Sequence, residues 1–483
     1  MPPPSATTSD ASARFQLISG NRLDRLAARL GARLAQPSAG VDDDDLRPET
    51  VLVPQPALRH WLLQTLAEQH GVAANLDIRT PTDLIWVLLR AERPELPVAS
   101  PWDPERLRWP LYALLSDPDA ALPPAVRAHL QAAGGGDAAA LARFALAGQL
   151  AQAFDRYLGY RADWLAQWEA GAERDDWQAT LWRLLRRRMG EAPHRAQLIA
   201  DWLQRHDREG AMGDQATRPL ALPPRLSAFG TLHVPPDQLR MLGVAAQWCA
   251  VDFYLPTPSA EYWGDVEALR TRLRADGPDK LPAALAEYQA DNPLLRDWGA
   301  GGREIVAQLF SYDSVVPESE IEVFAPPGRD SLLHRLQDDI LHRAPPRDDD
   351  TLAARDASLQ VHACHSRLRE VEVLHDRLRA MLDPHSPEGR AFDPPLQPRE
   401  VAVMAPDIGA YLPLARAVFG GVDANDPRHI PFSLADRPLV QSHPLLAAFV
   451  DLLDLGDTPL RAGAFLDLLS VPAIAQAQGL DAA

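Results

Sequence analysis

The sequence predicts an α/β, helix-rich fold made of two α/β units, with a large helical insertion in the first. Strand-like and helix-like patterns alternate near the N-terminus, which is typical of a parallel sheet covered by helices. Residues 83–208 have helical periodicity almost throughout. A proline-rich, charged stretch, residues 345–357, precedes a second alternation of strands and helices and is the best candidate for a linker.

The first α/β unit is expected to consist of residues 15–82 and 209–344, after a disordered leader at residues 1–14. Its first elements alternate strand and helix, at residues 15–19, 22–34, 50–53 and 57–70. After the insertion, short β-type runs return at residues 226–230, 251–255 and 321–324. Pro235 and Pro236 open the helix between the first two of these runs, because proline is favoured at a helix start.

The helical insertion, residues 83–208, carries aromatic and basic side chains whose roles the pattern leaves open. We interpret its tryptophans as core residues, namely Trp164, Trp168, Trp177 and Trp182. The densest basic run comprises Arg183, Arg186, Arg187 and Arg188. A solvated helix face is the simpler interpretation of this run, and contact with phosphates is the alternative.

The second unit, residues 358–483, is expected to be a truncated α/β domain. Its expected strands are residues 359–364, 401–405 and 431–434. Its expected helices are residues 367–381 and 410–419, with further helices from Leu445 and Ala462. The final residues, AIAQAQGLDAA, complete no α/β unit.

Composition limits the classes of function. The 483 residues suggest roughly two to four domains, and no apolar run or secretory signal predicts membrane insertion or export. Cys249 and Cys364 are the only cysteines, so no disulfide framework is expected and a cytoplasmic location fits. The net charge of −18 argues against a free-standing DNA binder but allows a local groove within an assembly.

No catalytic site is predicted. Lys280 is the only lysine and is followed by leucine and proline, so a G-x-x-x-x-G-K-[ST] phosphate loop cannot form. No G-x-S-x-G nucleophile motif occurs. Three carboxylates lie in one expected helix, namely Glu370, Glu372 and Asp376. Arg369 and Arg377 lie in the same helix, which favours ion pairing over a two-metal site.

A metal site is not predicted either. The metal-ligating side chains closest in sequence are His362, Cys364, His365 and His375. Side chains alternate along a strand, so His365 would point away from the two before it. The set also lacks the spacing that zinc sites favour.

Several blocks match, in order, a known family. They are SGNRLDRL (19–26), HWLLQTLAEQHGVAANLDI (60–78), FDRYLGYRADWLAQWE (154–169), YWGD (262–265), NPLLRDWG (292–299), HACHSRLREVEVLHDRLRAML (362–382) and ADRPLVQSHPLL (435–446). By this collinear set the chain resembles RecC proteins along nearly its whole length.

The resemblance implies that both units are RecA-like domains of a degenerate superfamily-one helicase that has lost its ATPase motifs. It implies a non-catalytic subunit of the RecBCD helicase–nuclease (exodeoxyribonuclease V), with RecB and RecD as partners and duplex ends and single strands of DNA as ligands. Its tasks would be strand threading and scanning for the sequence Chi during repair of double-strand breaks by recombination. It implies no cofactor in this chain, with ATP and Mg²⁺ bound by the partner subunits.

The resemblance also assigns a DNA-binding, Chi-scanning groove to Trp86, Asp155, Arg161 and Arg195. The tryptophan could stack on a base, the arginines could contact phosphates or base edges, and the aspartate could accept from a base amine. Other positions depart from the family's usual residues, namely Pro54, Pro56, His60, Thr80, Gln152 and Ala153. DNA threading is therefore better supported than any particular Chi sequence.

Two alternatives remain. One is a protein-interaction scaffold without DNA contact, which the acidic charge favours slightly. The other is an active helicase or nuclease subunit of the RecB or AddB type, which would need a phosphate loop or an iron–sulfur cysteine set that the sequence lacks.

Overall fold

The structure, a computed structural model, divides into two compact units, Met1–Ser358 and Leu359–Ala483. It describes residues 14–36, 47–172, 176–209, 215–266, 290–311, 315–345, 347, 356–421, 423, 426, 428–434, 443–454 and 461–480. Nearly all of the expected leader, most of the expected linker at residues 345–357, and Lys280 lie outside these residues.

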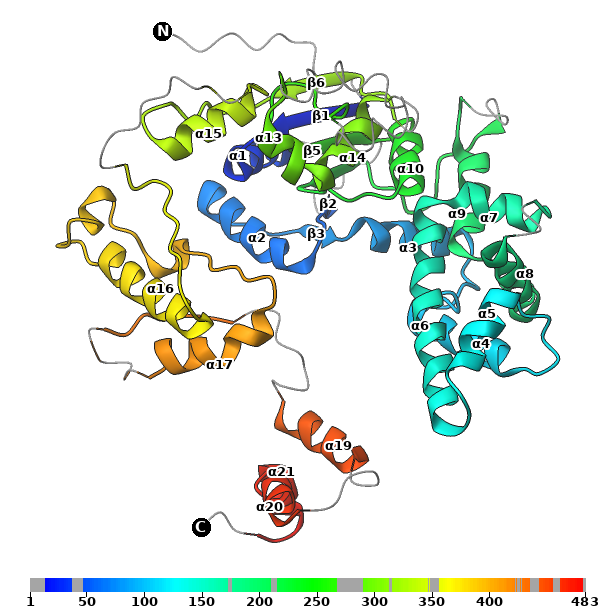
Figure 1. Ribbon diagram of the computed structural model, residues 1–483. Helices are drawn as coiled ribbons and strands as arrows, with labels where there is room; N and C mark the ends of the chain where they lie inside the picture. The colour runs from blue at the N-terminus through cyan, green and yellow to red at the C-terminus, as the bar shows by residue number, and fades with distance from the viewer. Residues whose placement is uncertain are drawn as a thin grey trace. The chain divides into compact units, whose positions relative to one another are not determined.

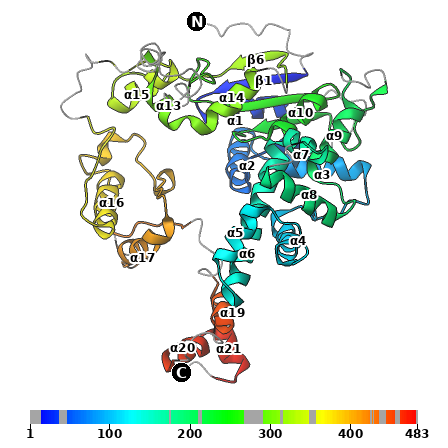
Figure 2. The ribbon, with the colours of Figure 1, turned by 45° about the vertical axis from the view of Figure 1, so that its right-hand side comes forward.

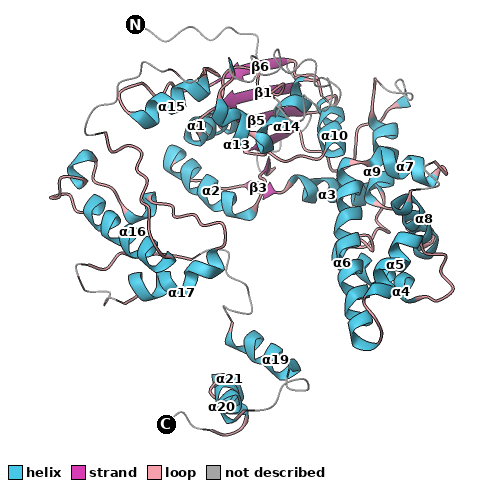
Figure 3. Ribbon diagram, in the orientation of Figure 1, coloured by secondary structure: helices cyan, strands magenta, loops and turns pink. Residues whose placement is uncertain are grey.

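The first unit is built on one parallel sheet of six strands in the order β3-β2-β4-β5-β1-β6. Figure 3 draws the strands in magenta. The strands are β1 (Phe15–Gly20), β2 (Glu49–Leu52), β3 (Leu76–Arg79), β4 (Arg225–Phe229), β5 (Ala250–Pro256) and β6 (Ser319–Glu322). Five of them confirm strands expected from the sequence. The sixth, β3, was missed because its pattern is only four residues long, with Leu76 and Ile78 as its apolar positions.

Helices cover both faces of this sheet, as an all-parallel sheet requires. On one face, Ile18 and Val51 pack with α1 (Leu23–Leu34) and α2 (Pro56–His70). On the other face lie α3 (Pro81–Glu92), α9 (Arg195–His206), α10 (Pro236–Ala246), α13 (Pro293–Trp298) and α14 (Ala300–Phe310). The first unit therefore has a RecA-like, three-layered α/β core.

A separate helical core lies between β3 and β4 in the sequence (Figure 1). It is built from α4 (Pro104–Ser116), α5 (Pro124–Ala132), α6 (Gly136–Tyr160), α7 (Ala162–Glu169) and α8 (Trp177–Met189). Trp168 and Trp182 are buried here, which confirms two of the four expected core tryptophans. Trp164 and Trp177 are 41% and 38% exposed, so that interpretation was wrong for these two, which lie at the rim of the core.

The chain passes from β1 into α1 through only two residues, Asn21 and Arg22. The Asn21 side chain donates to the Ala325 carbonyl oxygen and accepts from the Ala325 amide, both at 2.9 Å. Gly20 has no room for a side chain, since a Cβ would lie 2.9 Å from Val323. At this place a phosphate loop would need free backbone N–H groups around an anion, whereas here the turn is closed onto the segment after β6.

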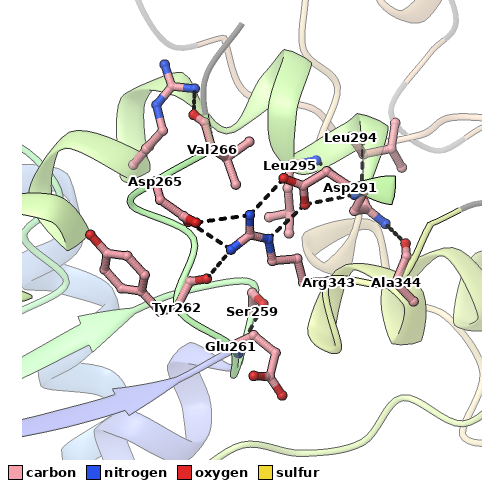
Figure 4. Close-up of polar contacts among 12 residues, drawn as sticks. Ser259, Glu261, Tyr262, Asp265, Val266, Asp291, Leu294, Leu295, Arg343 and Ala344 are labelled. Atoms are coloured by element: carbon pink, nitrogen blue, oxygen red, sulfur yellow. Dashed lines mark hydrogen bonds and ion pairs between the residues drawn. The ribbon is translucent and has the colours of Figure 1, made fainter. Parts of the chain in front are cut away.

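Arg343 and the acceptors around it secure the end of the first unit (Figure 4). Arg343, just after α15 (Leu332–Leu341), donates to Asp291 at 2.7 Å, Asp265 at 2.8 Å and the Tyr262 carbonyl oxygen at 2.7 Å. The two carboxylates hold the pKa of Arg343 well above its usual value, against the effect of burial. The YWGD and NPLLRDWG blocks thus meet at one point, where Asn292 also donates to the Ala344 carbonyl oxygen.

The second unit contains α16 (Arg367–Leu382), α17 (Ile408–Phe419), α19 (Pro444–Asp454), α20 (Ala462–Leu469) and α21 (Pro472–Ala477), with two 3-10 turns, Gly389–Ala391 and Pro398–Glu400. The expected helices are confirmed. The expected strands at residues 359–364, 401–405 and 431–434 were wrong, since the described residues form no strand there. A parallel strand needs a paired neighbour and cover on both faces, whereas Val361 and Met404 are about 90% exposed. Among the described residues, only one RecA-like domain is visible.

Two further findings concern the described part of the chain. None of its helices combines the length and apolar character needed to cross a bilayer. It contains no group of three or more His, Cys, Asp or Glu side chains arranged to hold a metal ion. Of the carboxylates on α16, Glu372 pairs with Arg369 at 3.1 Å and Glu370 accepts from the Tyr411 hydroxyl at 2.6 Å.

We predict that Arg225→Ala destabilises the first unit strongly. Arg225, 2% exposed, pairs with Glu49 at 2.6 Å and donates to the carbonyl oxygens of Arg33 and Gln36. Removing one partner leaves a half-buried carboxylate unpaired, so the free energy of unfolding in urea should fall by about 3–5 kcal/mol. The exposed pair of Arg22 and Asp24 provides the control, because Arg22→Ala should cost no more than about 1 kcal/mol. Equal losses in the two variants would contradict the prediction.

Candidate nucleic-acid interface

The candidate site lies at the carboxyl edge of the sheet, where ligands of open α/β folds bind. The strands β2, β3 and β4 end there, and α2, α3 and α10 begin there. Gln238 at the start of α10 donates to the Thr82 hydroxyl at 3.2 Å, which joins the first turns of α10 and α3.

Trp86 is positioned by α3, whose first turn is fixed by a capping box. The Thr80 hydroxyl accepts from the Asp83 amide and the Asp83 carboxylate accepts from the Thr80 amide, each at 3.2 Å. The Trp86 ring is partly buried against the core of the sheet, and the Arg90 guanidinium lies 5.1 Å from its centroid. Trp86 and Arg90 therefore form an arginine–aromatic pair of the kind that stacks on bases.

Asp155 and Arg195 meet although they lie on different helices. Asp155 is near the end of α6 and Arg195 is the first residue of α9, and their carboxylate and guanidinium groups are 3.7 Å apart. Arg195 also donates to the Asp155 carbonyl oxygen at 3.4 Å. Gly159 makes this approach possible, because a Cβ there would lie 3.0 Å from the Arg195 guanidinium and 3.6 Å from Pro235.

A buried polar network holds the start of α9 beneath Arg195. The His194 ring caps the helix by accepting from the Gln197 amide at 3.2 Å and contacts Glu169 at 2.9 Å. Glu169 also accepts from Trp182 and Gln197. Burial would raise the pKa of Glu169, but the hydrogen bond from His194 and the neighbouring positive charges outweigh it and keep the pKa below its usual value.

Arg161 lies at the junction of α6 and α7 and is exposed. Its guanidinium carbon lies 5.0 Å from the centroid of Trp164. Tyr160, the residue before it, is 42% exposed. Arg161 thus stands beside two exposed aromatic rings, in reach of solvent, a combination suited to a nucleic-acid strand.

Carboxylates surround Arg195. Burial raises the pKa of Asp237, the second residue of α10, to about 6, and the charge of Arg195 keeps it from rising further. Burial together with the charge of Asp155 raises the pKa of Asp103, which precedes α4. The Arg195 Nε and one Asp237 oxygen are buried without a hydrogen-bond partner among the described residues.

The arginine run on α8 divides into inner and outer members. Arg183 donates to the Ala172 carbonyl oxygen at 2.9 Å, and Arg186 donates to Gly190 at 2.8 Å and pairs with Glu169 at 3.4 Å. These bonds make both residues structural. Arg187 and Arg188 are exposed, and Arg188 lies 3.6 Å from Asp117.

Two of the positions that depart from the family's usual residues, Pro56 and Thr80, have roles in the local structure. Pro56 is the first residue of α2, where a missing N–H costs nothing, and Thr80 is the cap of α3. Pro54, His60 and Gln152 are exposed. Pro54 and Pro56 offer a strand neither a side-chain donor nor an N–H.

The site therefore offers guanidinium groups, aromatic faces and a carboxyl group with a raised pKa, which together can hold and orient an anionic polymer. The sequence reasoning missed Asp237, Tyr160 and Trp164. Trp164 and Tyr160 flank Arg161 in the sequence, which is a usable signal. Asp237 had none, because its closeness to Arg195 depends on how α9 and α10 pack.

The fold defines the class as a protein with a RecA-like α/β domain that carries a helical insertion, and comparison with known proteins identifies the family. Residues 15–343 match the family model described as RecC, N-terminal domain. The chain belongs to the RecC family.

Relatives named RecBCD enzyme subunit RecC come from several bacteria. The protein of Escherichia coli is 33% identical over 95% of this chain and 43% of its own length. That of Mycobacterium tuberculosis is 34% identical over 94% of this chain and 40% of its own length. That of Haemophilus influenzae is 29% identical over 89% of this chain and 42% of its own length. The chain thus spans less than half the length of these relatives.

We predict that Asp237→Asn stabilises the protein at neutral pH but not in acid. A carboxyl whose folded pKa is raised from 3.8 to about 6 contributes stability below pH 4 that is lost as the pH rises through 6. The asparagine stays neutral, so the variant should gain about 2–3 kcal/mol in unfolding free energy at pH 7 and nothing near pH 4. Asp201→Asn, an exposed change on α9, serves as control. A pH-independent difference would show that the Asp237 carboxyl does not titrate in this range.

Proposed function

We propose that this chain is a non-catalytic, DNA-handling subunit of a RecBCD-type helicase–nuclease, acting in repair of double-strand breaks by homologous recombination. The observation that carries this is the family match over residues 15–343, together with relatives whose names place RecC in the RecBCD enzyme. In this proposal RecB and RecD are its partners, and they bind the ATP and Mg²⁺. The closed turn at Asn21 supports the absence of a nucleotide site in the first domain.

Within this role, the carboxyl edge of the first unit would guide a separated strand and scan it for Chi. Trp86 would stack on a base, Arg161 would contact phosphates from its exposed position, and Arg195 would contact a phosphate or base edge. Asp155 would then both restrain Arg195 and accept from a base amine. Residues 358–483 would belong to a second RecA-like domain, which the HACHSRLREVEVLHDRLRAML block supports.

A protein-interaction scaffold without DNA contact is a second candidate. The net charge of −18 and the pairing of Arg195 with Asp155 favour it, because both oppose binding of a polyanion. Photocrosslinking of a labelled single strand in the complex reconstituted with RecB and RecD separates the two. Crosslinks to residues 81–92 or 155–195 support strand guidance, and crosslinks to the partner subunits alone support the scaffold.

We predict that Arg161→Ala and Arg195→Ala impair the response to Chi more than they impair unwinding. The motors would lie in RecB and RecD, whereas each arginine contact with the strand is worth about 1–3 kcal/mol, or roughly fivefold or more in Chi response. The measurement compares the Chi-dependent fragment with the unwinding rate in the reconstituted complex. Arg127→Ala, an exposed arginine on α5, is the control. Parallel loss of both activities would mean that the two arginines are structural.

We also predict that any Chi read by this protein differs from that of relatives with the usual polar residues. The motivation is the six departures, of which Pro54 and Pro56 can make no side-chain hydrogen bond. Each lost base contact costs about 1–3 kcal/mol, so two or three losses amount to roughly a hundredfold or more. DNA carrying a relative's Chi should therefore yield no Chi-dependent fragment, although unwinding persists. A normal fragment would show that these positions do not set specificity.

A further inference from the structure

An exposed aromatic surface lies on the helical core, away from the residues assigned above. Trp109 on α4 and Leu141 on α6 are 60% and 68% exposed, and Phe144 on α6 is 37% exposed. Helices α4 and α6 run alongside each other, as Figures 1 and 2 both show. We call the surface formed by Arg108, Trp109, Leu141 and Phe144 the α4–α6 face.

The side chains of this face are ordered by contacts with one another. The rings of Trp109 and Phe144 are 5.8 Å apart, and Tyr112 closes on Phe144 at 6.5 Å. The Arg108 guanidinium carbon lies 4.9 Å from the Phe144 ring centroid. Gly148 leaves room for that guanidinium, since a Cβ there would lie 3.1 Å from the Arg108 Nε. This Nε is buried and has no hydrogen-bond partner among the described residues.

The α4–α6 face is continuous with the candidate interface. Residues spaced three and four apart share one side of a helix, and the exposed stripe of α6 comprises Leu141, Ala145, Gln149, Gln152, Arg156 and Tyr160. From Arg156 to Ala145, the neighbours of Asp155 and Phe144, it extends eleven residues, or about 16 Å at 1.5 Å per residue. This length equals about five stacked nucleotides at roughly 3.4 Å each.

From this geometry we infer that a single strand of nucleic acid held at Arg161 and Arg195 continues along the stripe to the α4–α6 face, where Trp109 stacks on a base and Arg108 contacts a phosphate. This inference rests on the proposed function. A polyanion with aromatic bases fits the face better than an apolar protein segment does, because arginines accompany the rings. Arg106 is exposed one helical turn before Trp109, and Arg143 precedes Phe144. Aromatic stacking together with arginine is how proteins hold single strands without reading their sequence.

The test measures binding of the full chain to oligothymidylates of about four and about twelve nucleotides at low salt, by fluorescence anisotropy. Only the longer one can span both the candidate interface and the α4–α6 face. Trp109→Ala should weaken binding of the longer oligonucleotide by about five- to hundredfold and leave the shorter one unchanged. Trp109→Phe should retain most of the affinity. Trp298→Ala is the matched control, because Trp298 on α13 is 82% exposed and lies outside this surface.

The outcomes separate this inference from the proposed function. If Arg195→Ala weakens both oligonucleotides but Trp109→Ala weakens neither, the strand does not reach the α4–α6 face and only this inference is overturned. Equal weakening of both oligonucleotides by Trp109→Ala would assign Trp109 a structural role, which also overturns it. Loss of partner-subunit binding in place of loss of DNA binding would identify the face as a protein interface. No binding of either oligonucleotide by the unaltered chain would overturn this inference alone, because the proposed function concerns the complex with RecB and RecD and is tested there by photocrosslinking.

Discussion

Parallel pairing of β2 with β4 is the constraint on which the first unit depends. The pairing aligns Thr50 with Leu226 and is reinforced by the buried bond between Glu49 and Arg225, although the whole helical segment lies between them in the sequence. The chain leaves the sheet at the carboxyl end of β3 and re-enters it at the amino end of β4, so α9, which precedes β4, begins at the carboxyl edge and runs back to the amino edge. Trp86 on α3 and Arg195 on α9 are delivered to the same edge for this reason. The candidate interface is thus a consequence of sheet topology.

The charges at the carboxyl edge favour selective binding of a nucleic-acid strand over tight binding. Arg195 is not a free cation, since Asp155 pairs with it and Asp237 lies in its field. A strand that takes this arginine must compete with a carboxylate, and in a chain of net charge −18 little general attraction helps it. Such a site gains little from phosphate neutralisation alone, which agrees with the proposed role in scanning a strand.

The turn at Asn21 ties the end of β1 to the segment that follows β6. In a phosphate loop the first strand ends in backbone N–H groups that await an anion. Here the asparagine side chain instead bonds to both the amide and the carbonyl oxygen of Ala325.

The sequence by itself determined the elements of the first unit except β3, since helical periodicity and short apolar strands are local patterns that each element carries in its own residues. It also determined the family, through collinear blocks, and the absence of a lysine for a phosphate loop. It could not determine the strands of the second unit, because a strand exists only when a neighbour pairs with it, and residues 359–364 have no strand partner among the described residues. Only the tertiary structure brought Asp155 to Arg195, placed Asp237 beside them, and aligned Trp109 with Phe144. These contacts depend on how helices far apart in the chain pack, and no local pattern records that.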